Sequence, residues 1–80
     1  MDEVPIERRL RDRIDGLGPR VRTLLLAVLH LPEDRRAARI GELYADERTR
    51  AFAELLIDVE AEPSLRGFVI AELRRALNPS

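Results

Sequence analysis

The apolar stretch LLLAVL at residues 24–29 decides how the rest of this 80-residue chain folds. A helix built from this run is apolar around most of its circumference, which indicates a central, buried helix. Periodicity alone would also allow a short buried strand. The Gly18-Pro19 pair before the run and the Leu31-Pro32 pair after it fit a helix better. We therefore expect a helix over residues 19–30 at the centre of one apolar core.

Prolines and one aspartate indicate where the helices begin. Proline is tolerated in a first helical turn because its missing N–H would have no partner there. Four prolines precede apolar patterns of helical period, namely Pro5, Pro19, Pro32 and Pro63, and Asp46 is expected to cap a further helix. These signals predict helices over residues 5–15, 19–30, 32–44, 46–60 and 63–77. The predicted fold class is all-α, a compact bundle of five short helices forming a single domain over residues 1–80.

The same patterns predict which faces are buried and how two of the helices end. The expected core faces are Ile6, Leu10 and Ile14 in the first helix, and Ala37, Ile40 and Tyr44 in the third. Gly16 is expected to adopt the left-handed conformation that closes many helices, with Leu17 supplying the accompanying apolar contact. Asn78-Pro79 is expected to end the last helix.

Composition excludes several classes of protein. A hydrophobic fraction of 45% suffices for one core, and the absence of cysteine excludes a disulfide framework and a thiolate zinc site. Residues 1–10 are charged and lack the apolar stretch of a signal peptide. The longest apolar run is far shorter than a membrane span. We therefore expect a cytoplasmic protein with no membrane partner.

The sequence offers little catalytic chemistry. The one histidine, His30, ends the second predicted helix, where a protonated imidazole would favour the helix C-terminus. Neither Ser64 nor Ser80 has the surroundings of an activated nucleophile. Gly16 and Gly18 lack the following Lys and Ser/Thr of a phosphate-binding loop. We expect no enzymatic activity, no cofactor and no metal.

Charge is nearly balanced overall but unevenly placed. Fourteen arginines face fifteen acids, giving a net charge of −1, whereas a nucleic-acid-binding domain is usually basic. In the first helix the pairs Glu7–Arg11, Arg8–Asp12 and Arg11–Asp15 have i,i+4 spacing and opposite sign. Arg9 and Arg13 instead form a like-charged pair, which is either a solvated face or a basic stripe that binds a partner.

Three acids crowd the end of the fourth predicted helix, where anions are unfavourable: Asp58, Glu60 and Glu62. They are expected to face the N-terminus of the fifth helix and offset its dipole. The alternative is an acidic docking patch.

The order of these features resembles the caspase-recruitment domains of the death-fold superfamily. The segments concerned are IDGLG (14–18), LLLAVL (24–29), EDRRAARIGEL (33–43), DERTRAFAELLIDV (46–59) and LRGFVIAEL (65–73). They cover about three-quarters of the chain and match by order and pattern rather than by an invariant motif. The resemblance implies a six-helix Greek-key bundle, here without its last helix, that binds similar domains. Bacterial relatives of such domains act as adaptors in anti-phage immunity.

The resemblance also implies which residues bind the partner. Members of the family pair a basic surface on the first and fourth helices with an acidic surface on the second and third. The matching basic positions are Arg9, Arg13, Arg48 and Arg50, and the acidic candidates are Glu33, Asp34 and Glu42. The predicted function is a protein-interaction module that assembles with a similar helical domain, its own copy or one linked to an effector.

Two alternatives remain open from the sequence. Residues 46–60 and 63–77 are spaced like the scanning and recognition helices of a helix-turn-helix DNA-binding domain or small regulator. The acids at residues 58–62 would then lie beside phosphates, which disfavours nucleic acid as a partner. The other alternative is an antitoxin or subunit that an obligate partner stabilises.

Overall fold

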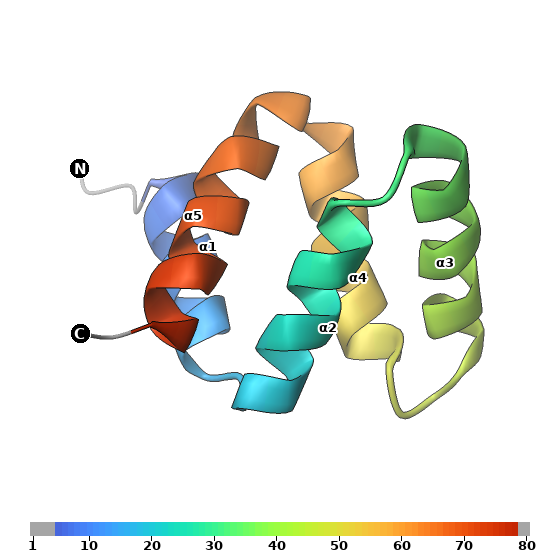
Figure 1. The fold of residues 1–80 in the computed structure, drawn as a ribbon, viewed down its shortest axis with the longest axis horizontal. Coiled ribbons are helices and arrows are strands. Elements are labelled where there is room, and N and C mark those ends of the chain that lie inside the picture. Colours follow the sequence, from blue (N-terminus) through green and yellow to red (C-terminus); the bar gives the residue numbers. More distant parts are fainter. Residues whose placement is uncertain (1–4, 79–80) are drawn as a thin grey trace.

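Five α-helices and one 3-10 turn make up the part of the chain that the computed structural model describes, residues 5–78. They are α1 (Ile6–Asp15), α2 (Pro19–Leu29), α3 (Glu33–Ala45), α4 (Arg50–Ala61), the 3-10 turn η1 (Pro63–Leu65) and α5 (Arg66–Leu77) (Figure 1). This range contains no strand. The all-α, five-helix prediction is confirmed. Pro79, which was expected to end the last helix, and Ser80 lie outside the described residues, as do residues 1–4.

Helix pairing does not simply follow chain order. Helix α5 packs against both α1 and α2, while α3 packs chiefly against α4 and less against α2 (Figure 1). Helix α2 lies near the middle of the bundle and buries Leu25, Val28 and Leu29, so the apolar run does form a central helix. Ala27 nevertheless remains exposed, because one side of α2 faces solvent.

The core draws on every helix. Its buried side chains are Leu10, Ile14, Leu25, Val28, Leu29, Ile40, Leu43, Ala53, Leu55, Leu56, Val59, Leu65, Val69 and Leu73. Two residues expected on core faces, Ile6 and Tyr44, are instead 47% and 44% exposed. Ala37 is also exposed. Helix α3 turns a neighbouring face inward and buries Arg36, Ile40 and Leu43.

The prediction that the fourth helix starts at Asp46 is wrong, because α4 begins at Arg50. Asp46 Oδ1 accepts a hydrogen bond from the backbone N–H of Arg48 at 2.9 Å, which closes a local turn instead of capping a helix. Thr49 Oγ1 donates to the carbonyl of Leu43 at 2.6 Å and so satisfies the end of α3. Residues 46–49, which were expected to begin the fourth helix, therefore form the turn between α3 and α4.

Gly16 does not adopt the left-handed conformation. Its φ of −81° and ψ of −3° lie in the right-handed region. The helix instead closes through bonds of a right-handed turn, in which the Gly16 N–H donates to the carbonyls of Asp12 and Arg13 at 3.2 Å and the Leu17 N–H to that of Ile14 at 3.0 Å. Arg22 of α2 adds to this closure, donating from Nε to the carbonyl of Ile14 at 3.1 Å and from Nη2 to that of Asp15 at 3.0 Å.

Candidate functional site

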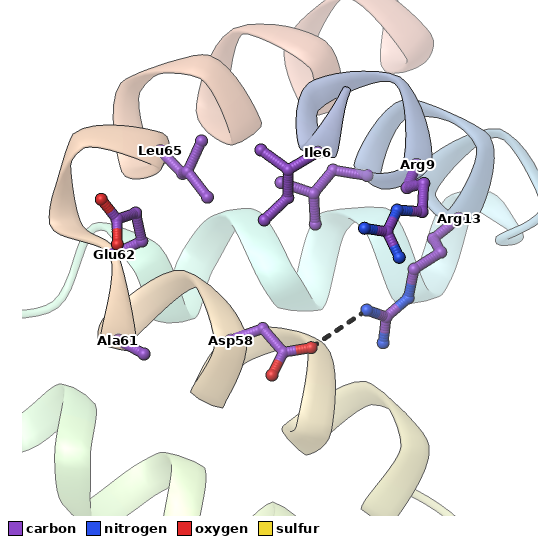
Figure 2. Close-up of a pocket in the computed structure, with 8 residues that line it drawn as sticks. Ile6, Arg9, Arg13, Asp58, Ala61, Glu62 and Leu65 are labelled. Atoms are coloured by element: carbon purple, nitrogen blue, oxygen red, sulfur yellow. Dashed lines mark hydrogen bonds and ion pairs between the residues drawn. The ribbon is translucent and has the colours of Figure 1, made fainter. Parts of the chain in front are cut away.

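A groove of about 400 Å³ separates α1 from the C-terminal end of α4 and the 3-10 turn (Figure 2). Its lining residues are Ile6, Arg9, Leu10, Arg13, Asp58, Ala61, Glu62 and Leu65. Leu10 and Leu65 are buried and form the floor, whereas Ile6 is 47% exposed. This groove combines exposed apolar surface with charges of both signs, which makes it the strongest candidate site in the described part of the chain.

The two sides of the groove carry opposite charge. Arg9 and Arg13 are one helical turn apart on α1 and therefore share a face. Asp58 lies in the last turn of α4, and Glu62 is the residue that directly follows the helix. A single ion pair bridges the groove, with Arg13 Nη1 and Asp58 Oδ2 separated by 3.2 Å (Figure 2). Both side chains are largely exposed, so this pair contributes at most about 1 kcal/mol to stability.

Two charged side chains of the groove, Arg9 and Glu62, are exposed and form no ion pair with another residue in the range 5–78. We refer to them as the two uncommitted charges. They are the charges in the groove that are available to a second molecule.

The four arginines predicted to bind a partner are not gathered on one surface. Arg9 and Arg13 line the groove, but Arg48 and Arg50 lie at the opposite end of α4. Arg48 Nη2 is 3.4 Å from Asp46 Oδ2. The pKa of the Asp46 carboxyl is lowered, chiefly by the hydrogen bond from the Arg48 backbone N–H and then by that from the Arg48 guanidinium. Arg50 Nε donates to the carbonyl of Tyr44 at 2.9 Å, and its guanidinium lies 5.2 Å from the centre of that ring.

The acids predicted on the third helix are also spread out. Glu33 and Glu42 are nine residues apart on α3, which corresponds to roughly 13 Å along a helix axis. Glu42 accepts a hydrogen bond from Arg39 Nη1 at 3.0 Å, so its charge is locally compensated. Asp34 is exposed, and Glu33 lines a separate polar pocket beside Arg36 and Arg66. These acids do not form one continuous acidic surface.

The three acids at the end of α4 diverge instead of facing the N-terminus of α5 together. Asp58 pairs with Arg13 of α1, while Glu60 pairs with Arg36 of α3 at 2.8 Å. Glu62 lines the groove. The prediction that all three acids share one role at the N-terminus of α5 is therefore wrong. Only Asp58 and Glu62 lie together, on the acidic side of the groove.

Arg36 is a structural residue that sequence analysis missed. It is only 6% exposed, and its Nη1 donates to the carbonyl of Leu31 at 2.9 Å while its Nε contacts Glu60. The available signal was the helical spacing of Arg36 with Ile40 and Leu43, which places all three on one face.

Charges expected to pair within α1 instead join α1 to α5. Arg11 Nε lies 3.4 Å from Glu72 Oε1, and the Arg11 guanidinium is 5.8 Å from the centre of the Phe68 ring. Asp15 Oδ1 lies 3.7 Å from Arg75 Nη2. The Arg75 side chain also contacts Glu72, and this hydrogen bond is the main cause of the raised pKa of Arg75.

His30 follows α2 as expected, and both of its ring nitrogens have polar neighbours. Nδ1 is 2.8 Å from the carbonyl of Leu26, and Nε2 is 3.2 Å from Arg74 Nη2.

Residues 5–78 hold no group of three or more His, Cys, Asp or Glu side chains placed to bind a metal ion. No helix in this range has both the length and the apolar character needed to cross a membrane. Comparisons with protein-family models, with curated proteins and with solved structures find no match to this chain.

Proposed function

We propose that this chain is a helical protein-interaction module that assembles with a second copy of itself or with a similar domain through the groove between α1 and α4. The observation that carries the proposal is the composition of that groove, an apolar centre between a basic and an acidic side. Protein interfaces typically combine an apolar centre with a polar rim. The side chain of Ile6, at the apolar centre of the groove, is nearly half exposed, because no other residue in the range 5–78 covers it.

The helix pairing is compatible with a more specific version of this proposal. Packing of α5 against both α1 and α2 joins helices that are distant in sequence, as a Greek-key bundle requires. This supports a domain similar to caspase-recruitment domains, acting in the cytoplasm as an adaptor in bacterial immunity. In this version the basic surface is reduced to Arg9 and Arg13, because Arg48 and Arg50 are engaged elsewhere.

The helix-turn-helix alternative has less support. Helix α5 would be the recognition helix, but α1 and α2 pack against it, and its exposed residues are only Gly67, Ala71, Arg74 and Arg75. Glu62 and Glu60 precede its start and would repel phosphates. Binding to duplex DNA is therefore measured as the competing hypothesis, beside self-association.

Sedimentation equilibrium at low and high salt, with chain concentrations up to the millimolar range, tests the proposal. The expected result is a mass that rises with concentration at low salt and falls toward that of the monomer at high salt, because salt screens charged contacts. A titration of mixed duplex DNA in low salt runs in parallel. A strict monomer at every concentration, or salt-sensitive DNA binding instead of self-association, would overturn the proposal.

A further inference from the structure

We infer that the groove is self-complementary: two copies dock groove to groove about a two-fold axis, and Arg9 of each copy faces Glu62 of the other. This inference rests on the proposed function and specifies its contact. It also replaces the pairing of first-helix arginines with third-helix acids that the family resemblance implies.

The positions of the two uncommitted charges lead to this arrangement. Arg9 and Glu62 lie on opposite sides of Ile6 (Figure 2). A two-fold rotation about an axis near Ile6 exchanges the two sides of the groove. The basic side of one copy is then placed against the acidic side of the other, and the same contact forms twice. Such an isologous contact needs one self-complementary patch, and two-fold dimers are the commonest homo-oligomers.

The apolar centre fits the same axis. Ile6 is 47% exposed, whereas Leu10 and Leu65 beneath it are 3% and 6% exposed. Ile6 and Ala61, which is also exposed, are therefore the apolar side chains that the groove offers to a partner. Near a two-fold axis, Ile6 packs against Ile6 of the other copy, and the charged residues lie around this contact.

The remaining groove charges do not compete with this pairing. Arg13 and Asp58 already satisfy each other at 3.2 Å. On α3, Glu42 is compensated by Arg39. Because only eight residues line the groove, the dimer belongs to the class of small, transient interfaces and should exchange rapidly.

A charge-swap experiment with two variants tests the contact. In R9E both Arg9–Glu62 contacts become acid against acid, and in E62R both become base against base. Each variant alone should have a dimer dissociation constant on the order of tenfold or more above that of the wild type, because like charges then oppose each other twice. Mixed one to one, the two variants should form a heterodimer, since one contact then has its two charges exchanged and the other keeps the wild-type pair, so opposite charges meet at both.

A matched control is R48E, which reverses an exposed arginine outside the groove and should dimerise like the wild type. Circular dichroism verifies that the exposed substitutions leave the helical content unchanged. If the wild type self-associates but the mixture of R9E and E62R remains monomeric, the two-fold contact is overturned while self-association stands. A monomeric wild type would overturn both proposals. Unimpaired association of E62R, with loss on reversing Glu33 or Asp34, would restore the contact with α3.

Discussion

Arg36 shows how one residue joins three parts of the molecule. Arg36 is 6% exposed, and its guanidinium lies between the carbonyl of Leu31 and the carboxylate of Glu60, so it links the α2–α3 connection to α4. A charge in such a position is tolerated only because both contacts are made. The contribution of the pair to folding is therefore measured best by removing one partner and then both.

We expect Arg36→Ala to lower the free energy of unfolding by about 3 kcal/mol, since it leaves the Glu60 carboxylate and the Leu31 carbonyl without their partner. Urea unfolding followed by circular dichroism measures the loss. Replacing both Arg36 and Glu60 with leucine should recover most of it, because well-packed apolar side chains can substitute for a buried ion pair. Arg35→Ala, at an exposed neighbouring position, is the control and should change stability by no more than about 0.5 kcal/mol. An equal effect of Arg35→Ala and Arg36→Ala would contradict the assigned role.

Residues such as Arg36 and Arg22 could not be assigned from sequence, for a physical reason. Their partners are the Glu60 carboxylate and the carbonyls at the end of α1, which only the folded chain brings near. Helical spacing with Ile40 and Leu43 separates Arg36 on the buried face from exposed Arg35, but it does not identify the groups that Arg36 contacts. For the same reason the groove could be predicted only in part. Arg9 and Arg13 were predicted as a basic stripe, and Asp58 and Glu62 only as part of an alternative acidic patch that included Glu60. That the two sets of charges face each other across one groove was not predicted.

At the scale of the helices, prediction succeeded where the signals are local. Helical period located all five helices and proline position marked the starts of four of them, because both act within a turn or two of the chain. Prediction of a helix start failed where a side chain could form hydrogen bonds in more than one way. Asp46 is a good helix cap by residue type, yet here it accepts from the Arg48 backbone and closes a turn.

Helix α3 contains an avoidable weakness at Gly41. A Cβ placed at this position meets no atom within 4 Å, so alanine would fit without strain. We expect Gly41→Ala to raise the free energy of unfolding by about 0.5–1 kcal/mol, because glycine in a helix interior loses more backbone freedom on folding. In a domain of this size that corresponds to a rise of several degrees in the thermal midpoint, roughly 2–8 °C, measured by circular dichroism.

Gly18→Ala is the matched control for this change. Gly18 also has open space where a Cβ would lie, but it precedes the first residue of α2 with an extended backbone. Glycine is preferred over alanine at such a cap position, so Gly18→Ala should not stabilise the chain. Stabilisation by both substitutions to the same degree would indicate an effect on the unfolded chain instead of on helix α3.

At the scale of the whole molecule, α1 combines a small share of the core with several ion pairs to other helices. Like α3 and α5 it contributes two apolar residues to the core, here Leu10 and Ile14, whereas α4 contributes four. Ion pairs supply much of the rest of its attachment, joining Arg11 to Glu72, Asp15 to Arg75 and Arg13 to Asp58. This attachment matters for function, because α1 carries Ile6 and Arg9 of the proposed contact.

Salt should therefore loosen α1 selectively. The Asp15–Arg75 and Arg13–Asp58 pairs are largely exposed, and such pairs weaken as ionic strength rises. Hydrogen exchange of backbone amides, followed by NMR at a concentration where the chain is monomeric, measures the effect. Between low and high salt we expect α1 amides to exchange about fivefold faster, equivalent to about 1 kcal/mol, while α2 amides change little. The Arg75→Gln variant should show faster α1 exchange already at low salt and a smaller further response to salt. A uniform response of α1 and α2 would mean that α1 opens only together with the whole bundle, and ion pairs would then have no special part in positioning the groove.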